Sequence, residues 1–298
     1  MEVHMMQPSG ETGKRGAATV VVVILGVALL YAGSLFAYWF FSGSARELDS
    51  PDFGDGSETV VLVTVTGIKT VDNRLEAKVL VIPDDALTDP RLDVLTEDLS
   101  VRLYPWNTLG DMKFPAGAAP AEVATTIDVG GDPTTWPFDT YTTDAISADV
   151  LVGEGDEREF RPARVEIEAA IQGWDISSAA APPSPQSYSE AGDEAVTLTL
   201  RRALGPLAFD IGICLVLVML PALALYTSLK VYRGRKEFQM PFLTWYAAML
   251  FAIVPLRNIL PGAPPPGAWI DVGLVMWVIL GLVVSMLIYV VAWNRRID

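Results

Sequence analysis

The sequence predicts an integral membrane protein that combines a membrane α region with an all-β domain. Four long apolar runs carry almost no charge, so each can form a transmembrane helix. The basic residues that flank these runs all fall on one predicted side of the membrane. Between the first two runs, short stretches of alternating polar and apolar residues are typical of strands. We therefore expect one N-terminal and three C-terminal spans, with an extracytoplasmic antiparallel β-sandwich inserted between spans 1 and 2.

The first apolar run, residues 17–41, contains no charged residue. Lys14 and Arg15 precede it, and aromatic residues at 38–41 close it, as at a membrane interface. The run is longer than the roughly 7–15 apolar residues of a signal peptide core. It therefore predicts an uncleaved anchor with a cytoplasmic N-terminus, and a signal peptide cleaved near residue 45 is the alternative.

Three further apolar runs, at 204–229, 242–260 and 269–293, predict the remaining spans. The densest basic cluster of the chain follows the second span, and two arginines follow the fourth. By the positive-inside rule both groups are cytoplasmic, which predicts a multi-pass plasma-membrane protein with both termini inside. The predicted parts are a cytoplasmic tail at 1–16, a transmembrane helix at 17–41, a flexible acidic linker at 42–58, an extracytoplasmic β domain at 59–203, and a three-helix membrane domain at 204–298.

The segment between the first two spans is acidic and rich in predicted strands. Residues 46–203 carry 12 lysines and arginines against 30 aspartates and glutamates, a net charge of −18. Seven strands at this spacing predict a single antiparallel sandwich of immunoglobulin-like architecture. The predicted strands lie at 59–68, 75–82, 99–104, 122–129, 146–152, 163–172 and 194–202.

The predicted β domain also contains a short helix, a surface loop and large aromatic residues. A short helix is expected at 89–98, and a surface loop at 178–189, which is rich in Ala, Pro and Ser. Its large aromatic residues are expected in the core, although a ligand platform is the alternative. The last strand runs almost directly into the second span, which ties the sandwich to that helix and fits either plain anchoring or signal transmission. These aromatic residues are Trp106, Trp136 and Trp174.

Charged residues within or beside the membrane are the best candidates for chemistry. Asp210 lies a few residues inside the second span, whereas Arg257, Asn258 and Asp271 flank the turn between the third and fourth spans. All are expected near the outer boundary, where ionisable groups are costly and usually pair or line a polar cavity. Arg257 paired with Asp271, or with Asp210, is the simplest arrangement. The alternatives are an ion, proton or lipid-headgroup site and a structural salt bridge.

The turn between the third and fourth spans has an unusual composition. Four prolines and two glycines lie between Pro261 and Gly267, so this stretch cannot be helical. The pattern Pro-Leu-Arg-Asn from Pro255, then Pro-Gly-x-Pro-Pro-x-Gly, then Asp271 resembles an uncharacterised membrane protein family of actinobacteria and some fungi, catalogued as domain of unknown function 4436. The family's layout of one N-terminal span, an outer domain and three C-terminal spans is similar, from about residue 17 to the C-terminus. The resemblance implies architecture only, because the family brings no known activity, substrate or cofactor.

The composition argues against several classes of protein. A net charge of −15 disfavours nucleic acid, whose phosphates require a basic surface. The single cysteine, Cys214, cannot form an internal disulfide, and a single histidine, His4, makes a His-based catalytic or zinc site unexpected. Acidic clusters such as Asp84-Asp85 match no calcium-loop spacing and are expected to be solvated. We therefore expect no enzyme, no metal and no cofactor.

Two hypotheses about function remain. The first is a non-enzymatic cell-envelope protein, an accessory or scaffold subunit whose outer β domain binds a protein partner or an envelope component. The second is a small transport or lipid-handling module that uses Asp210, Arg257 and Asp271. A carboxylate-pair enzyme is a third alternative, but no acid–base pair stands out among so many acids. Membrane lipids are expected partners, and the sequence leaves the oligomeric state open.

Overall fold

A computed structural model describes most of the chain after residue 50. The described residues are 50–105, 109–153, 158–182, 195–262 and 264–295, with Leu48, Gly155 and scattered positions between 21 and 40. The chain divides into two units, Met1–Ser44 and Ala45–Asp298. The predicted tail, part of the first predicted span, and Trp106 lie outside the described residues.

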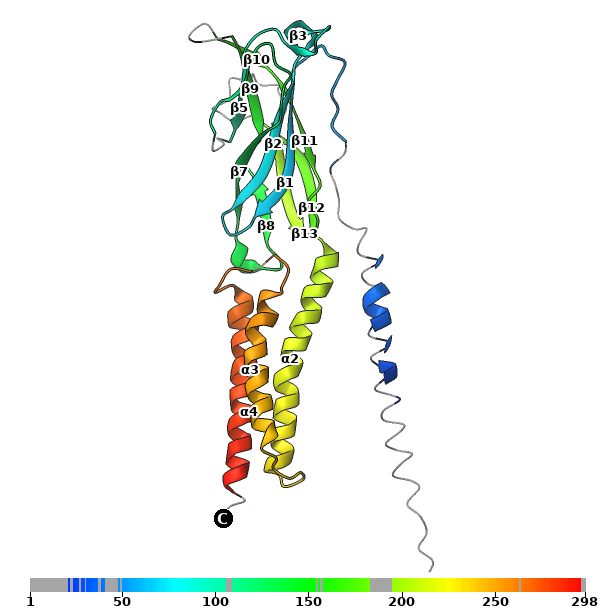
Figure 1. The fold of residues 1–298 in the computed structure, drawn as a ribbon, viewed down its shortest axis with the longest axis vertical. Helices are drawn as coiled ribbons and strands as arrows, with labels where there is room; N and C mark the ends of the chain where they lie inside the picture. The colour runs from blue at the N-terminus through cyan, green and yellow to red at the C-terminus, as the bar shows by residue number, and fades with distance from the viewer. Residues whose placement is uncertain are drawn as a thin grey trace, which may run out of the picture. The chain divides into compact units, whose positions relative to one another are not determined.

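The second unit begins with a β-rich domain (Figure 1). Its main sheet has seven strands in the order β11-β1-β2-β7-β8-β13-β12, and a second sheet has the order β10-β9-β5-β6. The remaining two strands, β3 and β4, form a small hairpin. The strands are β1 (Val60–Lys69), β2 (Arg74–Ile82), β3 (Thr88–Asp89), β4 (Val94–Leu95), β5 (Leu99–Tyr104), β6 (Met112–Phe114), β7 (Val123–Gly131), β8 (Thr140–Thr143), β9 (Ser147–Val152), β10 (Glu159–Pro162), β11 (Arg164–Ala169), β12 (Trp174–Ala181) and β13 (Ala195–Arg202).

The two larger sheets share one hydrophobic core. Val63 and Leu75 of the seven-stranded sheet and Val101 and Val150 of the four-stranded sheet are fully buried in the same cluster. The alternation of buried and exposed residues along β2 has the period of two expected of a strand with one face inward. The apolar residues that predicted the strands are therefore the residues that join the two sheets.

The seven predicted strands are all present, but the sheet is mixed rather than purely antiparallel. β1 pairs with β11 in parallel, with Val61 opposite Val165, whereas the other strand pairs described are antiparallel. Parallel neighbours need a long crossover connection, and here the intervening strands provide it. Alternation along a strand shows which residues face inward, but it contains no information about the direction of the neighbouring strand.

Two local predictions in the β domain are wrong. Residues 89–98 do not form a helix, because Asp89 accepts a hydrogen bond from the Arg91 N–H at 2.8 Å and Asp93 has a φ of 54°, which bends the chain into the β3–β4 hairpin. The loop predicted at 178–189 begins as strand, since β12 pairs with β13 as far as Ala181. β12 lies at the edge of its sheet with Ser178–Ala180 exposed, so it lacks the alternation that identified the other strands. Residues 183–194 lie outside the described residues.

The acidic linker is held to the β domain over its described part. Arg164 donates a hydrogen bond to the carbonyl oxygen of Asp52 at 2.9 Å and forms an ion pair with Glu58 at 2.7 Å. Two residues of the predicted linker, Asp52 and Glu58, therefore contact β11 directly, and the flexibility of the linker stays a prediction.

The β domain is followed by three helices, α2 (Leu204–Tyr232), α3 (Pro241–Asn258) and α4 (Met276–Asn294), with a π-helical turn at Asp271–Val275 before α4. Among the described residues, the helices at Leu204–Tyr232 and Asp271–Asn294 are long and apolar enough to cross a membrane. They correspond to the second and fourth predicted spans. The third predicted span corresponds to α3, which is shorter.

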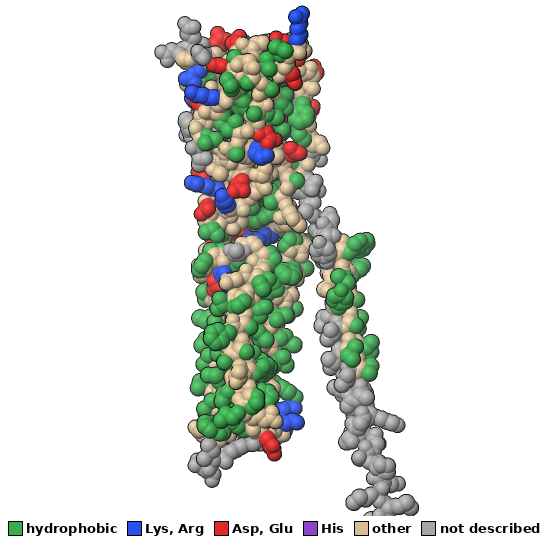
Figure 2. All heavy atoms as spheres, in the orientation of Figure 1, with side chains coloured by type: hydrophobic (Ala, Val, Ile, Leu, Met, Phe, Trp, Pro, Cys, Tyr) green, Lys and Arg blue, Asp and Glu red, His purple; other side chains and the backbone are tan. Residues whose placement is uncertain are grey.

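The helices expose apolar side chains, and their contacts include small and polar residues. Phe251 is 82% exposed, and Figure 2 shows apolar side chains covering the visible face of the helices. The fully buried Ser228 hydroxyl lies 2.6 Å from the Tyr246 hydroxyl and donates to the carbonyl oxygen of Ser285. A Cβ at Gly281 would lie 3.0 Å from Pro221, so these two helices approach closely there. Exposed apolar surface around a polar seam is the pattern expected for helices in lipid.

Candidate functional site at the base of the β domain

The β domain joins α2 with a single residue between strand and helix. β13 ends at Arg202, Ala203 is the N-cap residue, and α2 begins at Leu204. The Ala203 N–H donates a hydrogen bond to the carbonyl oxygen of Gly173, in the turn between β11 and β12, at 3.0 Å. The start of α2 is therefore bonded directly to the β domain, as the predicted Arg202-Ala203-Leu204 connection indicated.

A buried ion pair lies at this connection. Arg202 binds Asp139 with two hydrogen bonds, from Nε to Oδ1 and from Nη2 to Oδ2, the latter at 2.9 Å. The side chains of Arg202 and Asp139 are only 7% and 0% exposed. Bidentate pairs of this kind fix geometry strongly, and removal of either partner would leave a buried charge.

Aromatic residues complete the surroundings of this ion pair. The Tyr141 hydroxyl donates a hydrogen bond to Asp139 Oδ2 at 3.0 Å, and the Arg202 guanidinium lies 4.9 Å from the centre of the Trp174 ring. Burial raises the pKa of Tyr141 above its ordinary value, and the neighbouring Asp139 carboxylate raises it further. Tyr141 is therefore a neutral hydrogen-bond donor at physiological pH.

Trp136 links the β domain to the turn between α3 and α4. It is 1% exposed and packs against Leu260, Ala268 and Ile270. Its Nε1–H donates a hydrogen bond to the carbonyl oxygen of Pro261 at 2.9 Å. The prediction that Trp136 and Trp174 are core residues is confirmed, but Trp136 belongs to a separate cluster between the β domain and the helices.

The proline-rich turn is closed by the predicted pair of Arg257 and Asp271. Arg257 donates two hydrogen bonds to the Asp271 carboxylate, both at 2.9 Å, and a third to the carbonyl oxygen of Pro264 at 2.8 Å. The Gly267 N–H also donates to Asp271 Oδ2 at 2.9 Å. The pair therefore stabilises a stretch of backbone that proline prevents from forming its own helical hydrogen bonds.

Asp210 does not join either arginine through a hydrogen bond. It is 1% exposed, and neither of its carboxylate oxygens has a hydrogen-bond partner within the described part of the chain. It lines a cavity of about 230 Å³ whose other walls include Trp136, Phe138, Cys214 and Trp269. A buried carboxylate without a hydrogen-bond partner lowers the stability of a fold, so packing alone does not account for the position of Asp210.

The candidate residues thus lie in three different settings. Arg257 and Asp271 form one pair, Asp210 lines the cavity beside the base of the β domain, and Asn258 is exposed at the last position of α3. The ion pair of Asp139 with Arg202 was not predicted. Its only sequence signal was the short connection between the last strand and the second span.

Two protein families match consecutive parts of the chain. Residues 49–200, about half of the chain, match the family described as Domain of unknown function (DUF4436). Residues 202–296 match a second, Domain of unknown function (DUF8686), and the proline-rich turn that suggested the resemblance lies in this part. No curated protein matches the chain significantly. The boundary between the two matches falls at Arg202, where the β domain meets α2, and the chain belongs to the DUF4436 family.

Proposed function

We propose that the chain is a non-enzymatic multi-pass protein of the cell envelope, an accessory or scaffold subunit. In this proposal its outer β domain binds a protein partner or an envelope component. The observation that supports it most is the bonded connection between the β domain and the helices. A flexible tether would suffice for anchoring alone, whereas Arg202 with Asp139 and Trp136 with Pro261 hold the domain in one orientation.

The proposal includes the full predicted topology. In this proposal four spans cross the plasma membrane at 17–41 and along α2, α3 and α4, with both termini cytoplasmic and the mixed-sheet β domain inserted between the first two spans. The basic loop after α2 supports this direction, because it lies at the opposite end of α2 from the β domain (Figure 1). Carbonate extraction of membranes and accessibility labelling of residues 42–203 test it.

A recognition surface fits the exposed end of the β domain. Leu92, in the β3–β4 hairpin, is 70% exposed, and Figure 1 shows this hairpin at the end of the domain away from the helices. A large apolar side chain at the tip of a hairpin fixed to a membrane anchor is suited to contact with a partner at a set height above the bilayer.

Native mass spectrometry of the full chain, purified gently from its own membranes, tests the scaffold role. We expect a stoichiometric protein partner or envelope component that is lost when exposed β-domain residues such as Leu92 are replaced by alanine. Val71→Ala, in the β1–β2 turn, is the control for the Leu92 substitution, because Val71 is also an exposed apolar residue, 61% exposed, but lies outside the β3–β4 hairpin. If an alanine scan of the whole β-domain surface leaves every association unchanged, the scaffold proposal is wrong.

The cavity beside Asp210 favours a second candidate, a transport or lipid-handling module near the outer membrane boundary. A buried carboxylate with no hydrogen-bond partner among the residues that the structure describes, set among apolar side chains, is the arrangement expected where a polar or ionic group of a ligand binds. Native mass spectra distinguish this candidate from the first. A lone chain that retains a lipid, and loses it in Asp210→Asn, would favour it. If Asp210→Asn leaves the retained molecules unchanged, the Asp210 cavity has no such role.

A further inference from the structure

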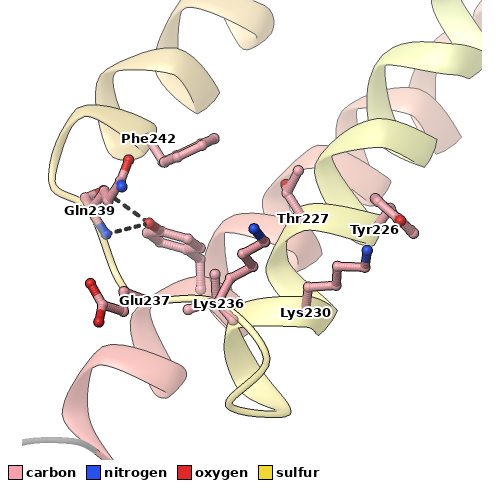
Figure 3. A pocket seen from close by; sticks show the side chains of 9 residues that line it. Tyr226, Thr227, Lys230, Lys236, Glu237, Gln239 and Phe242 are labelled. Carbon is pink, nitrogen blue, oxygen red and sulfur yellow. Dashed lines mark hydrogen bonds between the residues drawn. The ribbon is translucent and has the colours of Figure 1, made fainter. Parts of the chain in front are cut away.

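A second cavity lies at the other end of the helices. Its volume is about 360 Å³, and it is enclosed by the last turns of α2, the loop before α3, and α4. Figure 3 shows several of the side chains that form it. The polar residues that line it are Tyr226, Thr227, Lys230, Lys236, Glu237, Gln239 and Tyr289.

The wall of this cavity is held by hydrogen bonds rather than by loose side chains. The Gln239 backbone N–H donates to the Tyr289 hydroxyl at 3.0 Å, and that hydroxyl donates to the Gln239 carbonyl oxygen at 2.9 Å. Phe238 stacks on Trp293 with ring centres 5.9 Å apart. These contacts attach the loop to α4, so the cavity is formed before any ligand arrives.

The cavity carries a positive charge. Lys230 and Lys236 line it together with one acid, Glu237. Figure 3 shows the Lys230 side chain extending toward Tyr226, and the Glu237 carboxylate pointing away from both lysines. The Lys230 ammonium lies 4.5 Å from the centre of the Tyr226 ring, a contact that holds it at the rim of the cavity.

Aromatic residues around the cavity indicate the depth at which it lies. Tyr226 and Tyr232 are 57% and 39% exposed on α2, and Trp293 is 36% exposed on α4. Tyrosine and tryptophan gather at the headgroup level of a membrane, where their rings meet lipid and their polar atoms meet water. If α2 and α4 cross the membrane, the two lysines therefore lie level with the phosphates of the cytoplasmic leaflet.

We propose that this cavity binds the phosphate of an anionic phospholipid headgroup. Lys230 and Lys236 supply the charge, and the Tyr226 hydroxyl lies in the same lining as a hydrogen-bonding group, whereas the Thr227 hydroxyl donates to the carbonyl oxygen of Ala224 at 2.8 Å. Basic pockets between helices on the cytoplasmic side are a general means of recognising anionic headgroups. The inference rests on the proposed membrane crossing, but it does not depend on what the β domain binds.

The test compares two double variants with the same change of charge. Lys230→Gln with Lys236→Gln removes the two cavity lysines, whereas Arg233→Gln with Arg235→Gln removes two charges from the same loop outside the cavity lining. The full chain is titrated in detergent with phosphatidylglycerol or phosphatidylcholine, and bound lipid is counted by native mass spectrometry. Competition with inorganic phosphate separates a lipid site from a general phosphate site.

We expect one tightly held phosphatidylglycerol on the native chain, with affinity about tenfold or more lower in the lysine variant, because each lysine contributes to attraction of anionic lipid. The arginine variant should change by about twofold or less, and Lys230→Arg with Lys236→Arg should restore binding. Equal losses in both Gln variants, equal binding of phosphatidylcholine, or full displacement by inorganic phosphate would overturn the inference. Carbonate extraction of the same variants shows separately whether the chain spans the membrane at all.

Discussion

The two ends of the helices use basic residues in opposite ways. Where the helices meet the β domain, Arg202 and Arg257 each form a bidentate pair with a carboxylate and are largely buried. At the other end, Arg233 and Arg235 are exposed, and the lysines face a cavity. A charge that is buried with its partner fixes structure, whereas an exposed charge remains available to lipid and solvent. In the proposed topology, the end with the buried pairs fixes the orientation of the β domain, and the end with the exposed charges is the one that would face the inner leaflet.

Removal of Arg202 should have the largest effect. Arg202→Met leaves the fully buried Asp139 carboxylate without its cation, which should cost about 3–5 kcal/mol of unfolding free energy. Arg233→Met, at the other end, should change stability by less than about 0.5 kcal/mol because that residue is exposed. Denaturant unfolding in detergent measures both. Equal effects of the two substitutions would break the comparison between the ends.

Loss of the ion pair in the proline-rich turn should have the second-largest effect on stability. Asp271→Asn keeps the shape of the side chain but removes the charge that holds Arg257, so we expect a loss of about 1.5–3 kcal/mol. Hydrogen exchange should increase at Gly267, whose N–H donates to Asp271. Unchanged exchange at that amide would show that the turn keeps its conformation without the ion pair.

Replacement of Asp210 should raise the stability of the chain rather than lower it. Asp210→Leu removes a buried carboxylate that has no hydrogen-bond partner in the described structure, so stability should rise by about 1–3 kcal/mol. A gain in stability accompanied by loss of retained lipid would identify Asp210 as a functional group kept at a cost to stability. A loss of stability would instead show that the carboxylate has a stabilising partner in the membrane.

Among the buried groups, the smallest effect should come from Tyr141, and it should depend on pH. Burial raises the pKa of Tyr141 in the folded chain. The contribution of neutral Tyr141 to the free energy of unfolding is therefore complete below the pKa of the unfolded chain, about 10, and is lost as pH rises from there through the higher pKa of the folded chain. Tyr141→Phe removes the hydrogen bond to Asp139 and should cost about 0.5–1.5 kcal/mol at neutral pH. The variant should also lose stability less steeply than the native chain at alkaline pH. If the native chain and Tyr141→Phe lose the same amount of stability between neutral and alkaline pH, this prediction is wrong.

Periodicity in the sequence predicted the strands well because each strand carries its own inward face. All seven predicted strands formed, and their apolar residues such as Val63, Leu75 and Val150 are buried in the core. The order of the strands was beyond local reasoning, since the parallel pairing of Val60 with Arg164 joins distant parts of the chain. The predicted helix at 89–98 was wrong because hydrogen bonding by Asp89 favours a turn.

The candidate site was predictable where a charge stood out from apolar surroundings. Arg257 and Asp271 were recognised for this reason, and their pairing was one of the two arrangements considered. The pair of Asp139 with Arg202 could not be singled out, because Asp139 is one of many acids in the β domain and lies 63 residues from its partner. The isolation of Asp210 also depends on packing that only the folded structure provides.

The contacts of Arg202 and Trp136 hold the β domain in one orientation on the helices. The most direct test is a distance measurement by electron spin resonance between labels at Val71→Cys in the β1–β2 turn and Val284→Cys on α4, with Cys214→Ala to remove the native thiol. We predict a single narrow distance distribution for the native connection and a broader one when Arg202→Met is added. A broad distribution that Arg202→Met leaves unchanged would show that the connection is a flexible tether, and would contradict the account.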